Sequence, residues 1–105
     1  METVNLILTE IKSTVRDILP GAEIILFGSR ARNDNQYDSD YDLLIIVEFR
    51  MIVKEKLKYQ ALIRKNLAHK NILADIILQS KEEVKIKKKL LGHIVHSAIL
   101  EGIPV

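Results

Sequence analysis

Apolar side chains recur along the chain with two different periods, which divide it into helical and extended segments. Residues 3–19 carry them at helical spacing up to a Pro-Gly pair, which predicts an amphipathic helix. Short β-branched runs at 22–27 and 40–49 predict two strands. The second run is apolar without alternation, which indicates burial on both faces. A short helical turn is expected at 30–33, in the polar stretch between the strands.

The second half of the chain continues this alternation. Residues 51–68 predict a helix, and residues 71–78 predict a third strand with one acid, Asp75, inside it. Ser80 and Glu83 have the spacing of a capping box, which opens a last helix expected to run to about residue 101. The apolar face expected on the 51–68 helix consists of Val53, Leu57, Ala61, Leu67 and Ala68.

Glycine and proline set the limits of the last helix. Gly102 and Pro104 are expected to end it. Gly92 inside it costs about 1 kcal/mol relative to alanine, so a break there stays open. The predicted order is α-β-(α)-β-α-β-α over a single domain, residues 1–105. This order places the chain in the α/β (α+β) class, with a small sheet covered by helices.

Composition limits the function classes. The 105 residues include no cysteine, which excludes disulfides and a thiolate zinc site. No apolar run approaches the roughly 20 residues of a membrane span, and no basic segment precedes the first apolar residues. We therefore expect a cytoplasmic protein with no membrane association. The net charge of +2 is small, and the lysines of 81–89 are interpreted as a solvated helix face, so direct nucleic-acid binding is not expected.

Three aspartates stand in or beside the predicted strands. Asp40 and Asp42 are two residues apart and therefore project from the same face of a strand. Asp75 would join them if the third strand neighbours the second. Clustered carboxylates raise one another's pKa and destabilise a fold unless cations neutralise them. Oxygen ligands of this kind suit Mg²⁺, which prefers a few carboxylates together with phosphate oxygens and water.

A glycine and a serine follow the first predicted strand. Gly28 allows a sharp turn and a close approach of the main chain to a ligand. Exposed N–H groups at such a turn, beside the hydroxyl of Ser29, form an anion-binding concavity. Arg30 and Arg32 add positive charge within reach. A triphosphate on one side and paired metal ions on the other is the arrangement of two-metal phosphoryl chemistry.

These residues resemble a known signature. The sequence reads FGS at 27–29 and DYDL at 40–43, with ten residues between them. This resembles the signature of the DNA polymerase β-type nucleotidyltransferase superfamily. The wider run GSRARNDNQYDSDYDLLIIV is most similar to the minimal nucleotidyltransferases, the MNT proteins, and the resemblance extends to the ILEGIP ending. Asn33 stands where that family usually has glycine, and asparagine is the residue that next best tolerates a left-handed backbone.

The resemblance implies a nucleotidyltransferase fold with a small mixed sheet flanked by helices. Asp40 and Asp42 would hold two Mg²⁺ ions, and Asp75 would complete the metal site. Gly28 and Ser29 would bind the triphosphate of a nucleotide, which the resemblance implies is ATP. The implied reaction moves a nucleoside monophosphate to an acceptor and releases pyrophosphate.

The chain has about the length of such a catalytic core alone, so another protein or a second copy is expected to present the acceptor. A homodimer and a hetero-oligomer both stay open. MNT proteins are commonly paired with HEPN-domain proteins as antitoxin and toxin. The resemblance thus implies a protein adenylyltransferase antitoxin acting on a HEPN toxin. Two alternatives are a non-catalytic antitoxin that neutralises its partner by binding, and a small-molecule transferase whose acceptor site lies on a partner.

Other polar and aromatic residues have plainer interpretations. Asp34 and Asp38 are expected to be solvated turn residues. His93 and His96 have no further nitrogen or thiol ligand beside them, so they are interpreted as surface or interface residues. Two tyrosines, at 37 and 41, could stack on a base or accept a nucleotide. The second of them is expected simply to fill the apolar position between the two aspartates.

Overall fold

The computed structural model describes residues 2–105, with side chains from residue 6 onward. Helices and strands follow one another in the order α1 (Glu2–Ile18), β1 (Glu23–Phe27), α2 (Gly28–Arg32), β2 (Tyr41–Val47), α3 (Val53–Ala68), β3 (Ala74–Ser80), α4 (Lys81–Lys87), α5 (Ile94–Glu101) and β4 (Ile103–Pro104). The predicted α+β class is confirmed. Among the described residues, none of the helices is long and apolar enough to cross a membrane.

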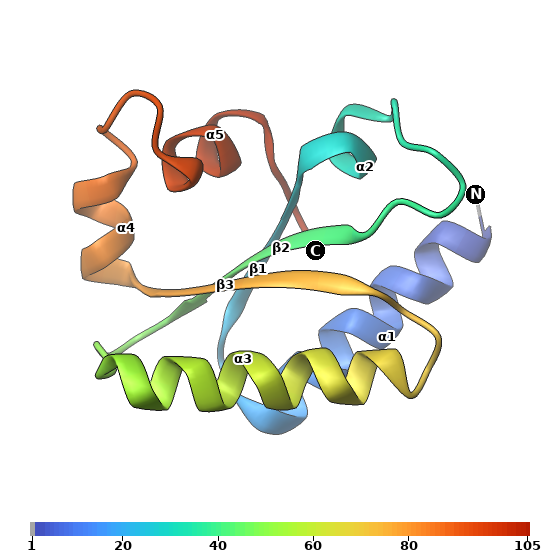
Figure 1. Cartoon of the computed structure of the whole chain (residues 1–105), viewed down its shortest axis with the longest axis horizontal. Coiled ribbons are helices and arrows are strands. Elements are labelled where there is room, and N and C mark those ends of the chain that lie inside the picture. The colour runs from blue at the N-terminus through green and yellow to red at the C-terminus, as the bar shows by residue number, and fades with distance from the viewer. Residues whose placement is uncertain (1) are drawn as a thin grey trace.

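The four strands form one mixed sheet in the order β3-β2-β1-β4. Strand β1 is antiparallel to both β2 and β4, whereas β2 and β3 are parallel. Helices α1 and α3 cover one face of the sheet and α4 and α5 cover the other, while α2 follows directly after the end of β1 (Figure 1). The third predicted strand therefore neighbours the second, which is the condition for Asp75 to lie near the other two aspartates.

Strand β2 runs through the centre of the core and separates two apolar clusters. Leu43 and Ile45 face α1 and α3, while Leu44 and Ile46 face α4 and α5. All residues from 43 to 47 are buried. The predicted burial of this strand on both faces is confirmed.

The predicted apolar face of α3 is correct at Leu67 and wrong at its other four positions, which are exposed. Val53 and Leu57 are 70% and 59% exposed. The helix buries Ile63 together with Leu67, and Tyr59 packs against the same cluster. These three residues are four positions apart and so form a stripe along the helix. Apolar residues occur around much of α3, and its contact with the sheet decides which of them become core.

The prediction of one continuous last helix is also wrong. The helix is interrupted near Gly92, where the sequence left a break open. Helix α4 ends at Lys87, Gly92 adopts a left-handed conformation with φ +81°, and α5 begins at Ile94. The capping box at the start of α4 is confirmed. Strand β4 was not predicted. The chain reaches it at Gly102, where a Cβ would lie 2.3 Å from a side-chain carbon of Ile25 on β1.

Candidate functional site

The predicted acids lie together at one end of the strands, where β1 ends and β2 and β3 begin. In the register, Asp42 is the partner of Phe27 on β1 and of Asp75 on β3. Side chains of paired residues on neighbouring strands project from the same face. Strand alternation puts Asp42 on the face of Leu44, and Asp75 on that of Ile77, which is the face covered by α4 and α5.

The turn from β1 into α2 brings the main chain against one of these acids. Gly28 has φ +72°, and a Cβ at this position would lie 2.2 Å from Oδ2 of Asp42. Only glycine combines this backbone conformation with so close an approach. Phe27, the residue before the helix, gives its start no side-chain cap, and Gly28 and Ser29 are half-buried. The bend is therefore in contact with the aspartate and is not sealed by packing.

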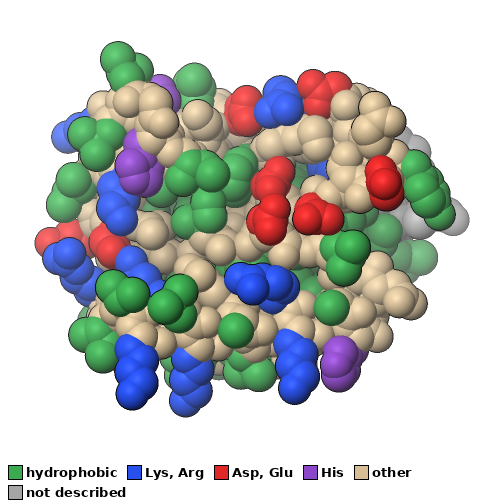
Figure 2. Space-filling view, viewed as in Figure 1, with side chains coloured by type: hydrophobic (Ala, Val, Ile, Leu, Met, Phe, Trp, Pro, Cys, Tyr) green, Lys and Arg blue, Asp and Glu red, His purple; other side chains and the backbone are tan. Residues whose placement is uncertain are grey.

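Electrostatics distinguish Asp42 from an ordinary surface acid. Partial burial raises its pKa, and the negative charges of Asp75 and Asp40 raise it further, while Arg32 opposes the shift. Asp40 and Asp75 are exposed. Acidic side chains gather at the surface on this side of the molecule (Figure 2). The three carboxylates are thus close enough to act on one another, as the sequence suggested, and the cluster favours a cation.

The donor chemistry fits a hard divalent ion, since the cluster supplies carboxylate oxygens and little compensating charge. Among the side chains that the structure describes, residues 6–105, no group of three or more His, Asp or Glu is already arranged as a set of metal ligands. Holding of Mg²⁺ by Asp40, Asp42 and Asp75 therefore stays a prediction.

The two arginines expected at the phosphates have different surroundings. Arg32 donates from Nε to Asp34 at 3.1 Å and from Nη1 to Glu101 at 3.0 Å, and its side chain is about half exposed. It lies near enough to Asp42 to lower the pKa of that carboxyl. Arg30 makes its contacts with the loop that follows α2. Phosphate binding by either arginine stays a prediction.

Two contacts at this end of the strands were missed from the sequence. Glu101 lies at the end of α5 and joins it to α2 through Arg32. Its place in the ILEGIP ending, which resembles that of the MNT proteins, is the sequence signal that could have drawn attention to it. The carbonyl of Ser39 accepts two hydrogen bonds from Arg30. A main-chain acceptor leaves no signal in the residue type.

The plainer interpretations agree with the structure. Asp38 is exposed and Asn33 ends α2 in the left-handed conformation, with φ 64°. His93 caps α5 by accepting the N–H of Val95 at Nδ1, at 3.1 Å. Tyr41 is buried on the face opposite Asp42, in the cluster under α1 and α3.

Comparison with known proteins assigns the family. Residues 8–96 match the family model for the nucleotidyltransferase domain. The fold is similar to a chain of a toxin–antitoxin crystallised with AMP-PNP, with 16% identity, a TM-score of 0.59 and coverage of 91% of this chain and 69% of that one. A chain from the complex of tri-AMPylated Shewanella oneidensis HEPN toxin with MNT antitoxin gives 16% identity, a TM-score of 0.57, and coverage of 95% and 69%.

None of the curated proteins compared with the sequence matches it. At 16% identity the two structural likenesses show the fold alone. The family match spans most of the chain, and it includes the Gly-Ser bend and all three aspartates. The chain therefore belongs to the nucleotidyltransferase domain family.

Proposed function

We propose that this chain is a Mg²⁺-dependent nucleotidyltransferase that moves AMP from ATP to a HEPN-domain toxin and so acts as its antitoxin. The observation that supports this best is the contact of Gly28 with Asp42, with Asp75 as the neighbouring residue on β3. In a chain of this family, that contact puts a candidate phosphate-binding bend beside a candidate pair of metal ligands.

Each residue then has a role. Asp40, Asp42 and Asp75 would hold two Mg²⁺ ions, which when bound stabilise the charge on the attacking and leaving oxygens. Gly28 and Ser29 would bind the triphosphate. A hydroxyl oxygen of the acceptor forms a bond to the α-phosphorus, and the bond from that phosphorus to the bridging oxygen breaks, so that pyrophosphate leaves. The carboxylate of Asp75, on the acceptor side, would take up the proton that this hydroxyl loses.

The electrostatics favour catalysis over binding alone. The pKa of Asp42 is raised by its partial burial and by its acidic neighbours, so the cluster costs stability in the absence of a cation. A subunit that acts only by binding has no need of such a cluster. The two similar structures support the choice of partner, because both are toxin–antitoxin complexes and one contains an AMPylated HEPN toxin.

The test is transfer of label from ATP labelled at the α-phosphate, with Mg²⁺ and the product of the neighbouring gene, which the proposal expects to be a HEPN-domain protein. We expect label on the toxin, and a loss of about a hundredfold or more in Asp42→Asn. Asp38→Asn is the matched control, because this nearby acid is exposed and outside the cluster. Equal rates for Asp42→Asn and the unmodified chain would show that the site is wrong. Tight toxin binding without label would favour the non-catalytic alternative.

A thermal measurement tests the site without a partner. ATP with Mg²⁺ at 100 times its dissociation constant adds about 2.7 kcal/mol to the free energy of unfolding. ATP with EDTA should add much less, because the cluster then repels the triphosphate. The difference between the two conditions should vanish in Asp42→Asn and persist in Asp38→Asn. A shift that is the same with Mg²⁺ and with EDTA would argue against a metal-bridged nucleotide.

A further inference from the structure

Arg30 lies directly after the Gly-Ser bend, but its side chain reaches to the far end of the following loop. Its Nε and Nη2 donate to the carbonyl of Ser39 at 3.0 and 2.7 Å. Nη2 also donates to the carbonyl of Tyr37 at 3.2 Å. The guanidinium carbon lies 4.1 Å from the centre of the Tyr41 ring. The Arg30 side chain thus contacts two main-chain carbonyls and one aromatic ring.

These contacts lie immediately before and after Asp40. Ser39 precedes it, and its hydroxyl also accepts the N–H of Gln36 at 2.9 Å. Tyr41 follows it and is only 7% exposed, so its ring is held in place by packing in the core. Asp40 itself is exposed. Its place relative to Asp42 is therefore set by the two neighbours that Arg30 connects.

We propose that Arg30 is a positioning residue that holds Asp40 beside Asp42 for a divalent cation. It is not, in this proposal, a ligand of the nucleotide phosphates. The cation's place in a nucleotidyl transfer rests on the proposed function, whereas the binding of the cation itself does not. Arginine suits this task because its planar fork donates to several acceptors while it stacks on a ring.

The two roles for Arg30 predict different effects of a lysine. A phosphate ligand acts through its charge, which lysine keeps. A residue that positions the loop acts through the several hydrogen bonds of its planar guanidinium group and through its stacking on the ring. Lysine loses both. The Nε and Nη2 atoms are already used by the loop, so contact with a phosphate through them would release the carbonyls of Ser39 and Tyr37.

The experiment measures Mn²⁺ binding by the loss of the free-ion electron paramagnetic resonance signal, in the unmodified chain and in Arg30→Lys and Arg30→Gln. We expect both variants to weaken Mn²⁺ binding about tenfold to a hundredfold, as loss of supporting contacts does at other metal sites. ATP binding in EDTA should change less than about twofold. Hydrogen exchange of the amides at 34–40 should become faster in both variants.

Arg16→Lys is the matched control. Arg16 also donates from Nε to a main-chain carbonyl, that of Ala22 at 3.4 Å, but before β1 and away from the cluster. It should leave Mn²⁺ binding unchanged. Tyr41→Leu removes the ring beneath the guanidinium and keeps an apolar side chain. It should weaken Mn²⁺ binding less than the Arg30 variants, and it tests the positioning role if Arg30→Gln does not fold.

Three results would overturn the proposal. Full Mn²⁺ affinity in Arg30→Lys would show that charge alone matters. Weaker ATP binding in EDTA with unchanged Mn²⁺ binding would make Arg30 a phosphate ligand. Absence of Mn²⁺ binding by the unmodified chain would leave Arg30 no cation site to support. Mn²⁺ binding that depends on Arg30, in a chain that transfers no label, would support the positioning role and refute the transferase.

Discussion

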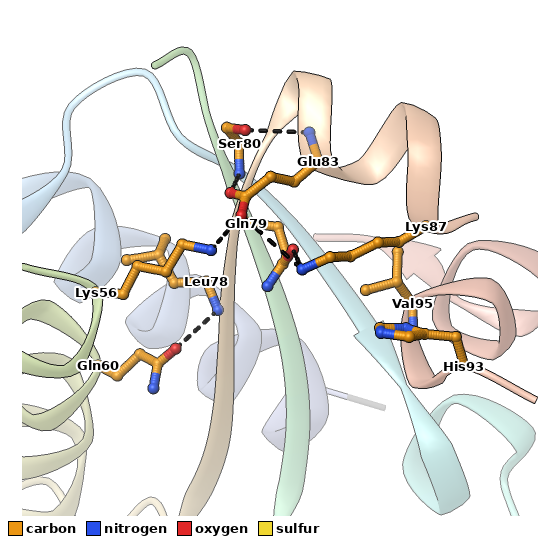
Figure 3. Close-up of polar contacts among 9 residues, drawn as sticks. All are labelled: Lys56, Gln60, Leu78, Gln79, Ser80, Glu83, Lys87, His93 and Val95. Atoms are coloured by element: carbon orange, nitrogen blue, oxygen red, sulfur yellow. Dashed lines mark hydrogen bonds and ion pairs between the residues drawn. The ribbon is translucent and has the colours of Figure 1, made fainter. Parts of the chain in front are cut away.

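The two ends of β3 carry acids in opposite electrostatic situations. At its start, Asp75 stands beside Asp42 in a cluster of like charges. Just beyond its other end, Glu83 lies at the start of α4, where its carboxylate accepts hydrogen bonds from α3 and β3 (Figure 3). Only the acid beyond the second end, Glu83, has hydrogen-bonding and positively charged partners that neutralise its carboxylate.

At the neutralised end, every part of the Glu83 carboxylate has a partner. Oε1 accepts the N–H of Ser80 at 2.9 Å, and Oε2 accepts from Lys56 on α3. Burial alone would raise the pKa of Glu83, but the hydrogen bonds from Lys56 and Ser80 outweigh it and lower the pKa. The same carboxylate caps α4 and connects it to α3, so its charge serves stability.

At the other end, the pKa of Asp42 is raised by partial burial and by Asp75 and Asp40. In the described part of the chain, the three aspartates of the cluster join no two helices through an ion pair, and a glycine is needed to make room for Asp42. An acid cluster that costs stability and joins no elements is typical of a functional site. The comparison therefore separates a structural acid from candidate functional ones.

The largest effect on stability is expected at the neutralised end. Lys56→Met removes the partner of a carboxylate that is only 9% exposed. Breaking one side of a buried pair should lower the free energy of unfolding by about 3 kcal/mol. Urea denaturation at pH 7 measures this as a lower midpoint. Lys54→Met, on the exposed surface of the same helix, is the control and should change little.

The same pair has a defined pH dependence. Because the folded pKa of Glu83 is lowered, its contribution to stability is present above the unfolded pKa of about 4.3 and is lost as pH falls through the folded value. Glu83→Gln should remove this acid-dependent part of the stability curve. Equal midpoints for Lys56→Met and Lys54→Met would refute the pair's structural role.

A smaller loss is expected from Gly28→Ala. The left-handed backbone at φ +72° costs a non-glycine residue about 1–3 kcal/mol. Gly21→Ala is the matched control, with φ +82° and nothing within 4 Å of a Cβ there. Both variants should unfold at lower urea, but only Gly28→Ala displaces the carboxylate of Asp42. Loss of Mn²⁺ binding should thus occur in Gly28→Ala alone, and its appearance in both would point to a general effect of strain.

The contrast also explains which features the sequence could predict. The shared face of Asp40 and Asp42 follows from strand alternation, and the bend follows from glycine. The pairing of Asp42 with Asp75 depends also on the register of β2 and β3, which the pattern does not contain. The contacts of Arg30 could not be predicted, because its acceptors are main-chain carbonyls that any residues at 37 and 39 would supply. The buried face of α3 is decided by the sheet it meets, since apolar residues occur on several of its sides. The two-residue strand β4 is too short to carry a pattern.

The smallest effect has the opposite sign and tests the comparison most directly. Between the unfolded pKa of an aspartate, about 3.9, and the raised pKa of Asp42, the folded chain binds more protons than the unfolded one. Stability therefore falls as pH rises through this window, and above it the full cost of the charge is present. Asparagine carries no charge, so Asp42→Asn should melt at a slightly higher temperature than the unmodified chain at pH 7.

That advantage should disappear near pH 3, where both forms are neutral, while Asp38→Asn should show no such change because Asp38 is exposed. Added Mg²⁺ should reverse the order at pH 7, because only the carboxylate gains from the cation. Differential scanning calorimetry over this pH range measures both effects. A lower melting temperature of Asp42→Asn at pH 7 without Mg²⁺ would mean that the acid already has a structural partner, and Asp42 would then belong with Glu83.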